Sequence, residues 1–446
     1  MTDNPIPRSA RGEPLAAQAR ALTHAGEWQQ AADKLRQLVL EITGVAVGEL
    51  TINRDQYSLN SLNGQLQLAD GRGLFFKYHH EEGEDHTIEE YYNAELLRNN
   101  GFRVDVPLYA CGEPGRQILL YRLRHDRRLA DVCREIELQQ SWPQMAPVVD
   151  AQHRADAEIL RMTLPTLKIG QSAAVAREPI HQLFHHRLVS PGATPGLGGR
   201  VAQFYVGKTF QLAQLELSWT QLQDLQWEIN GVRYRHTLGE LLLQAGELLA
   251  PAELAQHGVV IAHGDAHNAN VWYETDRPPP QLVSFDPAFA GRNIPALLAE
   301  IKATFHNIFA HPFWLYEPQR CATHYRVAAR LEGQRLIVEH DWQLTPLRAA
   351  FLQDKGTLYW RPLLSELTTR GWLPHNWRRL MRLALFCCPT LVLDLRAGGG
   401  SGHTPASSAL GFAIAMMLGS EPVDGKDVAS RWFTAIDPQF GGERAF

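Results

Sequence analysis

The spacing of hydrophobic and polar positions divides the chain into one region of strand period and longer regions of helical period. Between residues 47 and 123 the apolar residues recur in five short runs, which predicts the five strands of an antiparallel sheet. The predicted strands cover residues 49–59, 64–70, 73–79, 106–113 and 117–123. The dipeptides Asn63-Gly64 and Asp70-Gly71 favour tight turns, and we expect them to connect the first three strands.

Helical periodicity flanks this region on both sides. A single apolar face over residues 15–42 predicts one or two helices that pack outside the sheet. The pattern also predicts mainly helical structure for residues 142–250 and 318–446, with residues 319–337 as one amphipathic helix. We therefore expect an α+β protein with three parts: an N-terminal helical extension (1–44), a small lobe (45–123) and a mostly helical lobe that ends in a C-terminal helical extension (124–446).

The stretch Val259–Gly291 interrupts the helical pattern. Its apolar runs VVIA and QLVSF each end at a polar cluster, and the prolines 278–280 separate them, which predicts a strand, a loop, a hairpin and a second loop. The first loop contains Asp265 and Asn270, and the second contains Asp286. An Asp that accepts a proton, followed by an Asn and a second Asp that hold metal ions, is what Mg²⁺-dependent phosphoryl transfer requires.

Two other interpretations of this stretch stay open. The rim between two strands collects His, Asp and Asn as ordinary turn formers and helix caps. His263, Asp265 and His267 are also suitable ligands for a transition metal, which would make the protein a metal-dependent hydrolase. That second alternative needs further ligands from other strand ends, and no such cluster stands out in the sequence.

The segment HGDAHNAN at residues 263–270 resembles the H-G-D-x-H-x-x-N catalytic loop of aminoglycoside phosphotransferase-like and choline-kinase-like small-molecule kinases. The segment SFDPAFAG at residues 284–291 is similar to their metal-binding segment. The resemblance implies a two-lobed, protein-kinase-like fold with ATP and Mg²⁺ as cofactors. By this resemblance Asp265 is the catalytic base, His263 braces the loop, and Asn270 and Asp286 are the Mg²⁺ ligands.

The same resemblance assigns roles in the small lobe. Lys77 takes the place of the strand lysine that grips the α- and β-phosphates of ATP, and Glu95 or Glu90 on the next helix is its expected partner. Residues 121–123 are expected to line the adenine pocket, with Tyr121 and Leu123 as its named members. The loop at residues 57–64 lacks the GxGxxG pattern, so phosphate contacts would come from its polar side chains, Ser58, Asn60 and Ser61.

The implied reaction transfers the γ-phosphoryl group of ATP to a hydroxyl of a small molecule such as a sugar, an amino sugar, an aminoglycoside or an amino alcohol. The acids within residues 81–85 are compatible with a cationic acceptor. The Gly- and Pro-rich residues 190–200 are interpreted as a mobile loop over the substrate, with a plain linker as the alternative. Residues 295–297 carry no Asp where the family often has one to tie down the catalytic loop. A catalytically silent nucleotide-binding protein is the alternative function.

Composition limits the binding partners and the cellular compartment that we expect for this protein. The 446 residues carry a formal net charge of −5, so no general attraction to nucleic acid or to an anionic membrane is expected. No apolar run approaches the length of a membrane span, and the N-terminus lacks the apolar core of a signal peptide. The five cysteines show no CxxC spacing, which favours packed thiols and a cytoplasmic location.

Overall fold

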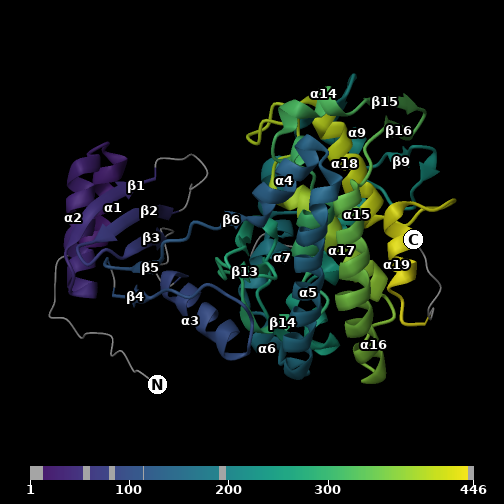
Figure 1. Cartoon of the computed structure of the whole chain (residues 1–446). Helices are drawn as coiled ribbons and strands as arrows, with labels where there is room; N and C mark the ends of the chain where they lie inside the picture. The colour runs from purple at the N-terminus through teal and green to yellow at the C-terminus, as the bar shows by residue number, and fades with distance from the viewer. Residues whose placement is uncertain (1–13, 54–60, 80–85, 114, 190–196, 440–446) are drawn as a thin grey trace. The chain divides into compact units, whose positions relative to one another are not determined.

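The computed structural model describes residues 14–53, 61–79, 86–113, 115–189 and 197–439. The chain divides into two compact units (Figure 1). The first comprises Met1–Asp126 and Val283–Ala288, and the second comprises Arg127–Leu282 and Phe289–Phe446. The segment around Asp286 thus belongs to the first unit, whereas the division expected from the sequence placed it in the helical lobe.

The first unit is built on the five-stranded antiparallel sheet that the sequence predicts, in the order β1-β2-β3-β5-β4. Its elements are α1 (Leu15–His24), α2 (Trp28–Thr43), β1 (Val47–Ile52), β2 (Ser61–Leu68), β3 (Gly73–His79), α3 (His86–Asn99), β4 (Tyr109–Cys111) and β5 (Ile118–Arg122). Leu35 and Val39 of α2 share one hydrophobic core with Leu66 and Phe76 of the sheet. The predicted packing of the N-terminal helices against the sheet is confirmed.

One predicted turn in this sheet is wrong. Gly64 lies inside β2, where it pairs with Ile52 on one side and Phe76 on the other. A Cβ atom on Gly64 would lie 2.1 Å from the carbonyl oxygen of Thr51, so the glycine serves close approach of neighbouring strands. The connection between β1 and β2 falls on residues 54–60, outside the described part of the chain. The turn at Asp70-Gly71 is confirmed, with Gly71 at a φ of 86°.

The second unit is mostly helical, as predicted. Its helices are α4 (Leu129–Gln139), α5 (Ala146–Thr163), α6 (Ser172–Val175), α7 (His185–Leu188), α8 (Gly199–Phe204), α9 (Trp219–Leu222), α10 (Leu238–Leu248), α11 (Pro251–Leu254), α12 (Ile301–Thr304), α13 (Pro312–Leu315), α14 (Cys321–His324), α15 (Pro346–Asp354), α16 (Arg361–Thr369), α17 (Trp377–Val392), α18 (Pro405–Gly419) and α19 (Val428–Ala435). Two π-helical stretches, η6 (Phe305–Phe309) and η8 (Lys355–Trp360), extend α12 and α15. Helices α17 and α18 pack side by side in its core (Figure 1).

Its strands are β6 (Arg127–Arg128), β7 (Thr209–Leu212), β8 (Leu215–Ser218), β9 (Gln226–Ile229), β10 (Val232–Arg233), β11 (Val259–Ala262), β12 (Val271–Glu274), β13 (Gln281–Ser284, whose last two residues belong to the first unit), β14 (Gly291–Pro295), β15 (Val327–Glu332) and β16 (Arg335–His340).

Part of the helical prediction for this unit is wrong. Residues 319–337 do not form one helix, because β15 and β16 form a hairpin with Glu332 opposite Arg335 and Gly333 at a φ of 61°. β16 also pairs with β9, which builds a four-stranded sheet in the order β10-β9-β16-β15. The segment 209–233, which was also predicted to be helical, contains the strands β7, β8, β9 and β10, with only the short helix α9 between β8 and β9. Tertiary pairing of segments about a hundred residues apart overrides the local pattern here.

The predicted layout of residues 259–291 is confirmed. Strand β11 leads into the first polar loop and pairs with β14, with Ala262 opposite Gly291. Strands β12 and β13 are neighbours in a three-stranded sheet with β6. All five cysteines are buried as free thiols. Among the described residues, no helix combines the length and the apolar character that crossing a membrane demands.

Candidate active site

The loop at residues 263–270 has a backbone conformation that its sequence requires. It follows the buried strand β11, and Gly264 adopts a φ of 78°. A Cβ atom at Gly264 would lie 2.7 Å from the carbonyl oxygen of Phe289 and 2.9 Å from Ile180. Glycine is therefore needed both for the left-handed conformation and for the close contact with Phe289.

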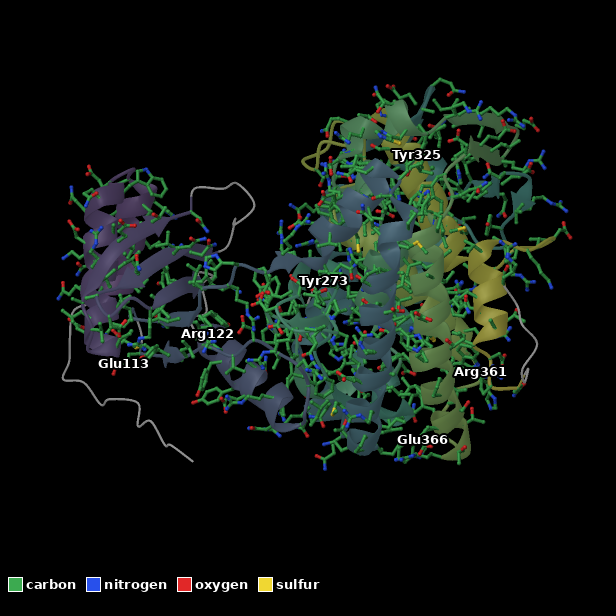
Figure 2. All side chains as sticks on the ribbon, viewed as in Figure 1. Glu113, Arg122, Tyr273, Tyr325, Arg361 and Glu366 are labelled. Atoms are coloured by element: carbon green, nitrogen blue, oxygen red, sulfur yellow. The ribbon has the colours of Figure 1, made fainter. Side chains whose placement is uncertain are left out.

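Hydrogen bonds within the loop hold the main chain of Asp265 on both sides. Its N–H lies 3.4 Å from Nδ1 of the buried His263, and its carbonyl oxygen accepts from the N–H of His267 at 2.8 Å. The same carbonyl accepts from the side-chain amide of Asn270 at 3.0 Å. His263 and Asn270 thus both contact the main chain of Asp265, and the bracing role that the resemblance implies for His263 stays a prediction. Strand β12 follows directly, and its Tyr273 packs against the core (Figure 2).

A buried asparagine on η6 contacts the loop at residues 263–270. Asn307 lies in η6, and its side-chain oxygen accepts a hydrogen bond of 2.8 Å from the N–H of Asn268. Both residues are buried, with exposed fractions of 4% and 6%. The Nδ1 atom of His267 also caps this turn by accepting from the N–H of Ala269 at 3.3 Å. The loop at residues 263–270 is therefore held by a side chain of η6.

A buried cation lies beside the Asp265 carboxylate. Lys302 Nζ is 3.9 Å from Asp265 Oδ1, and the lysine side chain is only 4% exposed. Its ammonium also contacts Nε2 of His306 at 2.8 Å, and Nδ1 of His306 contacts the hydroxyl of Tyr316. Burial lowers the pKa of Lys302, while the charge of Asp265 raises it. Burial and then the charge of Lys302 hold the pKa of His306 well below its ordinary range, so this imidazole is neutral and accepts from the lysine.

The second group of predicted residues lies in the first unit. Lys77 Nζ on β3 forms an ion pair of 2.7 Å with Oδ1 of Asp286. The lysine side chain is 12% exposed and that of Asp286 is 38% exposed. Asp286 adopts a φ of 56°, which is an unfavourable conformation for a residue with a Cβ atom. The next residue is held by the Asn93 side chain, which donates to the carbonyl oxygen of Pro287 at 3.2 Å. The structure therefore joins two predicted residues that are 209 positions apart.

The other predicted residues of this unit are only partly described. Glu95 forms an ion pair of 2.5 Å with Arg98, and the side chain of Glu90 lies outside the described part, so the carboxylate partner of Lys77 stays a prediction. Ser58 and Asn60 fall in residues 54–60, which are not described, and Ser61 begins β2. Tyr121 is buried in β5, and the N–H of Leu123 donates to the carbonyl of Gly73 at 3.0 Å.

Asp286 in the first unit and Asn270 in the second each offer oxygen, the donor that hard metal ions prefer, and their role as metal ligands stays a prediction. Asp286 offers carboxylate oxygens, and the amide nitrogen of Asn270 is used by Asp265, which leaves the amide oxygen as the donor atom for a metal. Within the part of the chain that the structure describes, no group of three or more His, Cys, Asp or Glu side chains is arranged to hold a metal ion. The hydrolase site of His263, Asp265 and His267 therefore gains no support from the geometry.

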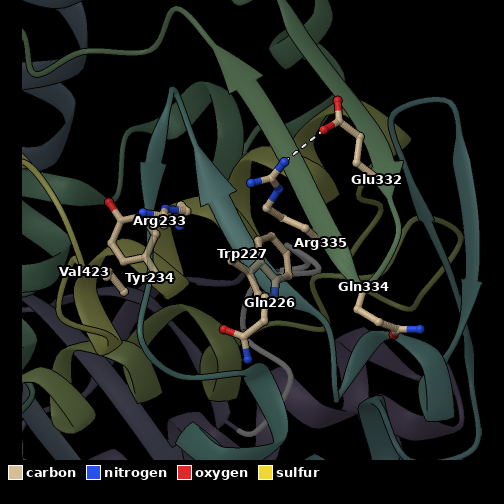
Figure 3. Close-up of a pocket in the computed structure, with 8 residues that line it drawn as sticks. All are labelled: Gln226, Trp227, Arg233, Tyr234, Glu332, Gln334, Arg335 and Val423. Carbon is tan, nitrogen blue, oxygen red and sulfur yellow. Dashed lines mark hydrogen bonds and ion pairs between the residues drawn. The ribbon is translucent and has the colours of Figure 1, made fainter.

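A separate pocket of about 350 Å³ lies on the four-stranded sheet of the second unit (Figure 3). Trp227 and Tyr234 form part of its wall. The two arginines that line it already have carboxylate partners, because Arg335 pairs with Glu332 at 3.0 Å and Arg233 pairs with Asp424. None of the residues predicted for the site lines this pocket.

Sequence reasoning missed Lys302, His306 and Asn307. All three are buried polar residues on the segment 301–309, which the hydrophobic pattern marks only as a helix. A lysine flanked by apolar residues on a buried helix was the available signal, because a buried cation usually has a specific partner. Nothing in the pattern indicates that the partner is Asp265.

No protein-family model matches the chain, and no curated protein matches it. Similar solved structures include a putative fructosamine-3-kinase from Thermobifida fusca, with 14% identity, a TM-score of 0.37 and coverage of 86% of this chain and 98% of that one. An amicoumacin kinase in complex with AMP-PNP and Ca²⁺ has 12% identity, a TM-score of 0.39 and coverage of 86% and 92%. A microcompartment-associated aminopropanol kinase has 11% identity, a TM-score of 0.38 and coverage of 90% and 98%. At these values the likeness carries no inference about the activity of this chain.

Proposed function

We propose that this chain is an ATP- and Mg²⁺-dependent small-molecule kinase of protein-kinase-like fold, which transfers the γ-phosphoryl group to a hydroxyl of its acceptor. The observation that carries the proposal is the ion pair between Lys77 and Asp286, with Asp286 held in a left-handed conformation. A lysine on a central strand, paired with an aspartate in a left-handed conformation, is an arrangement suited to holding a metal-bound triphosphate.

The chain's residues take the following roles in this proposal. Asp265 accepts the proton of the acceptor hydroxyl while the bond from that oxygen to the γ-phosphorus forms and the bond to ADP breaks. Asn270 and the hydrogen bonds of the loop keep the Asp265 main chain fixed, so little reorganisation is needed during the transfer. His263 supports the loop from its buried position.

Lys77, with Glu95 or Glu90, would align the α- and β-phosphates, and Ser58, Asn60 and Ser61 would contact them from above. Tyr121 and Leu123 would line the adenine pocket. Asn270 and Asp286 would hold Mg²⁺, which supplies neutralisation of the charge on the phosphates when it is bound.

The test is the variant Asp265→Asn, with Asp276→Asn in the exposed turn of the same hairpin as its matched control. MgATP binding is measured by calorimetry, and ADP release is measured in the presence of sugars, amino sugars, aminoglycosides and alcohols. We expect Asp265→Asn to keep MgATP binding and to lose at least about a hundredfold in turnover, since general-base catalysis contributes roughly 10²–10⁴-fold. The control is expected to match the wild type.

The outcomes separate the alternatives. Binding of MgATP without transfer to any acceptor in the wild type would favour a catalytically silent nucleotide-binding protein. Hydrolysis that depends on tightly held Zn²⁺, Mn²⁺ or Fe²⁺ and needs no nucleotide would favour the hydrolase. Unchanged turnover in Asp265→Asn would remove this residue from the mechanism.

A further inference from the structure

Three cationic side chains of the second unit act electrostatically on one another, and two of them interact with Asp265. These are Lys302, whose Nζ lies 3.9 Å from Asp265 Oδ1, Arg187 on α7 and Arg200 on α8. Both arginines reach the end of α17, where the carbonyl oxygen of Leu391 accepts from Arg187 at 3.5 Å and from Arg200 at 2.8 Å. Helix α17 packs against α12, which carries Lys302. The charge of Asp265 raises the pKa of both Arg187 and Lys302, and the charge of Arg187 lowers the pKa of Lys302.

The positive charges of this cluster exceed the negative ones. Within the described residues neither Arg187 nor Arg200 forms an ion pair with a carboxylate, and their hydrogen bonds go to main-chain carbonyls only. Asp265 is the carboxylate whose charge acts on Arg187 and on Lys302. Burial, and then the like charge of Arg200, lower the pKa of Arg187 to about 10, so the guanidinium still carries its charge at neutral pH. A partly buried cation without a counter-charge is costly unless a ligand supplies one.

The carbonyl groups at the end of α17 satisfy the hydrogen-bonding donors of only one of these two arginines well. Arg200 makes two good hydrogen bonds there, to the carbonyls of Leu391 at 2.8 Å and Val392 at 3.0 Å, as expected of a cation at the C-terminus of a helix. Arg187 makes a single hydrogen bond at the 3.5 Å limit, and a guanidinium has five N–H donors. Most donors of Arg187 are therefore left for another acceptor.

We infer that Arg187, Arg200 and Lys302 form an anion-binding subsite beside Asp265, and that the phosphate acceptor is a hydroxy compound carrying a carboxylate or a phosphate group. This inference rests on the proposed function and narrows its substrate class. An arginine fork binds a planar carboxylate or a phosphate through paired hydrogen bonds. The anion of the acceptor would bring its hydroxyl to Asp265 and neutralise the excess positive charge. A cationic acceptor such as an aminoglycoside would be repelled by the same three groups.

Matched acceptors and arginine variants test the subsite. Binding of D-glycerate and glycerol 3-phosphate, with glycerol as the neutral analogue, is measured by calorimetry on the full chain in the presence of MgADP. Wild-type protein is expected to bind at least one of the two anions and to prefer it over glycerol by about tenfold or more. Arg187→Gln is expected to weaken anion binding by about tenfold or more, because a hydrogen bond to a charged group is lost. Arg187→Lys should restore part of the loss.

The matched control is Arg379→Gln. Arg379 is another largely buried arginine whose Nη1 donates to a helix-end carbonyl, that of Gly419 at 2.7 Å, but it belongs to no proposed site. This variant should leave anion binding unchanged. If Arg187→Gln fails to fold, the comparison of the wild type with Arg187→Lys decides the matter, since the lysine keeps the charge and loses the fork.

Several results would overturn the inference. These are no anion binding to the wild type, equal binding of glycerol and the two anions, or a loss in Arg187→Gln that Arg379→Gln reproduces. A weaker affinity of Arg187→Gln for MgATP, with anion binding unchanged, would assign the cluster to the nucleotide instead. Failure of the proposed function is distinguishable, because it appears as absent MgATP binding or absent phosphoryl transfer whatever the charge of the acceptor.

Discussion

Replacing Lys77 by methionine separates the contribution of its ion pair to stability from its contribution to catalysis. Methionine keeps most of the apolar volume of the lysine stem in β3 and removes the charge. The ammonium lies 2.7 Å from Asp286 Oδ1. The variant therefore removes one well-defined interaction and leaves the sheet intact.

The loss of stability is expected to be small. Coulomb's law gives about 6 kcal/mol for this distance at an effective dielectric constant of about 20. The side chain of Asp286 is 38% exposed, so solvent screens the pair and the net contribution falls to about 1 kcal/mol. For unfolding of the whole chain of 446 residues, the melting temperature should then fall by about 1 °C. The catalytic loss should be far larger, about 10²–10³-fold in turnover, because a charge that meets the transferring phosphates acts where water is excluded.

The assay compares thermal unfolding and Mg²⁺-dependent ADP release in Lys77→Met and in a control, Arg72→Met. Arg72 forms an ion pair of the same length, 2.7 Å, with Asp70 at the turn between β2 and β3. Both variants should lose similar, small amounts of stability, and only Lys77→Met should lose turnover. Equal turnover in the two variants would refute a phosphate-binding role for Lys77. A collapse of stability confined to Lys77→Met would show that the ion pair is structural.

Two further predictions concern the second unit. Asn307→Ala should destabilise the protein by about 1–3 kcal/mol and lower turnover, because the buried N–H of Asn268 loses its acceptor. Asn307→Asp keeps an acceptor at this position, so it should restore most of the stability and most of the turnover. Urea unfolding and turnover together check this, and equal losses in the two variants would contradict it. Burial lowers the pKa of His181 to about 4, below its value near 6.5 in the unfolded chain, so its contribution to stability is complete above pH ~6.5 and is lost as the pH falls towards 4. When the pH falls from 7.5 to 5, this single group should lower the free energy of unfolding, measured with urea, by about 2 kcal/mol. His181→Phe should remove that part of the pH dependence. An identical pH dependence in the wild type and the variant would disprove the prediction.

Local patterns in the sequence determined much of the secondary structure of this protein. The period-two runs predict the five-stranded antiparallel sheet, and the order of residues in Val259–Gly291 alone indicates the pair of polar loops around a hairpin. Such features depend on residues close together in the chain, because the alternation of side chains in a strand and the residue preferences of turns are local properties of the sequence. The same local reading misplaced the turn at Asn63-Gly64, because a glycine that permits close approach of strands looks like a turn glycine.

Only the tertiary structure decided which distant residues meet. Residues 319–337 were expected to be helical, but a hairpin there is stabilised by pairing with β9, about a hundred residues earlier. The hydrogen bond from the loop at residues 263–270 to Asn307, and the interactions of Lys302 and Arg187 with Asp265, likewise depend on packing of α7, α12 and η6. A buried charge or amide looks the same in the sequence whatever its partner is, because the free energy that fixes it arises from a contact that the chain makes only when folded.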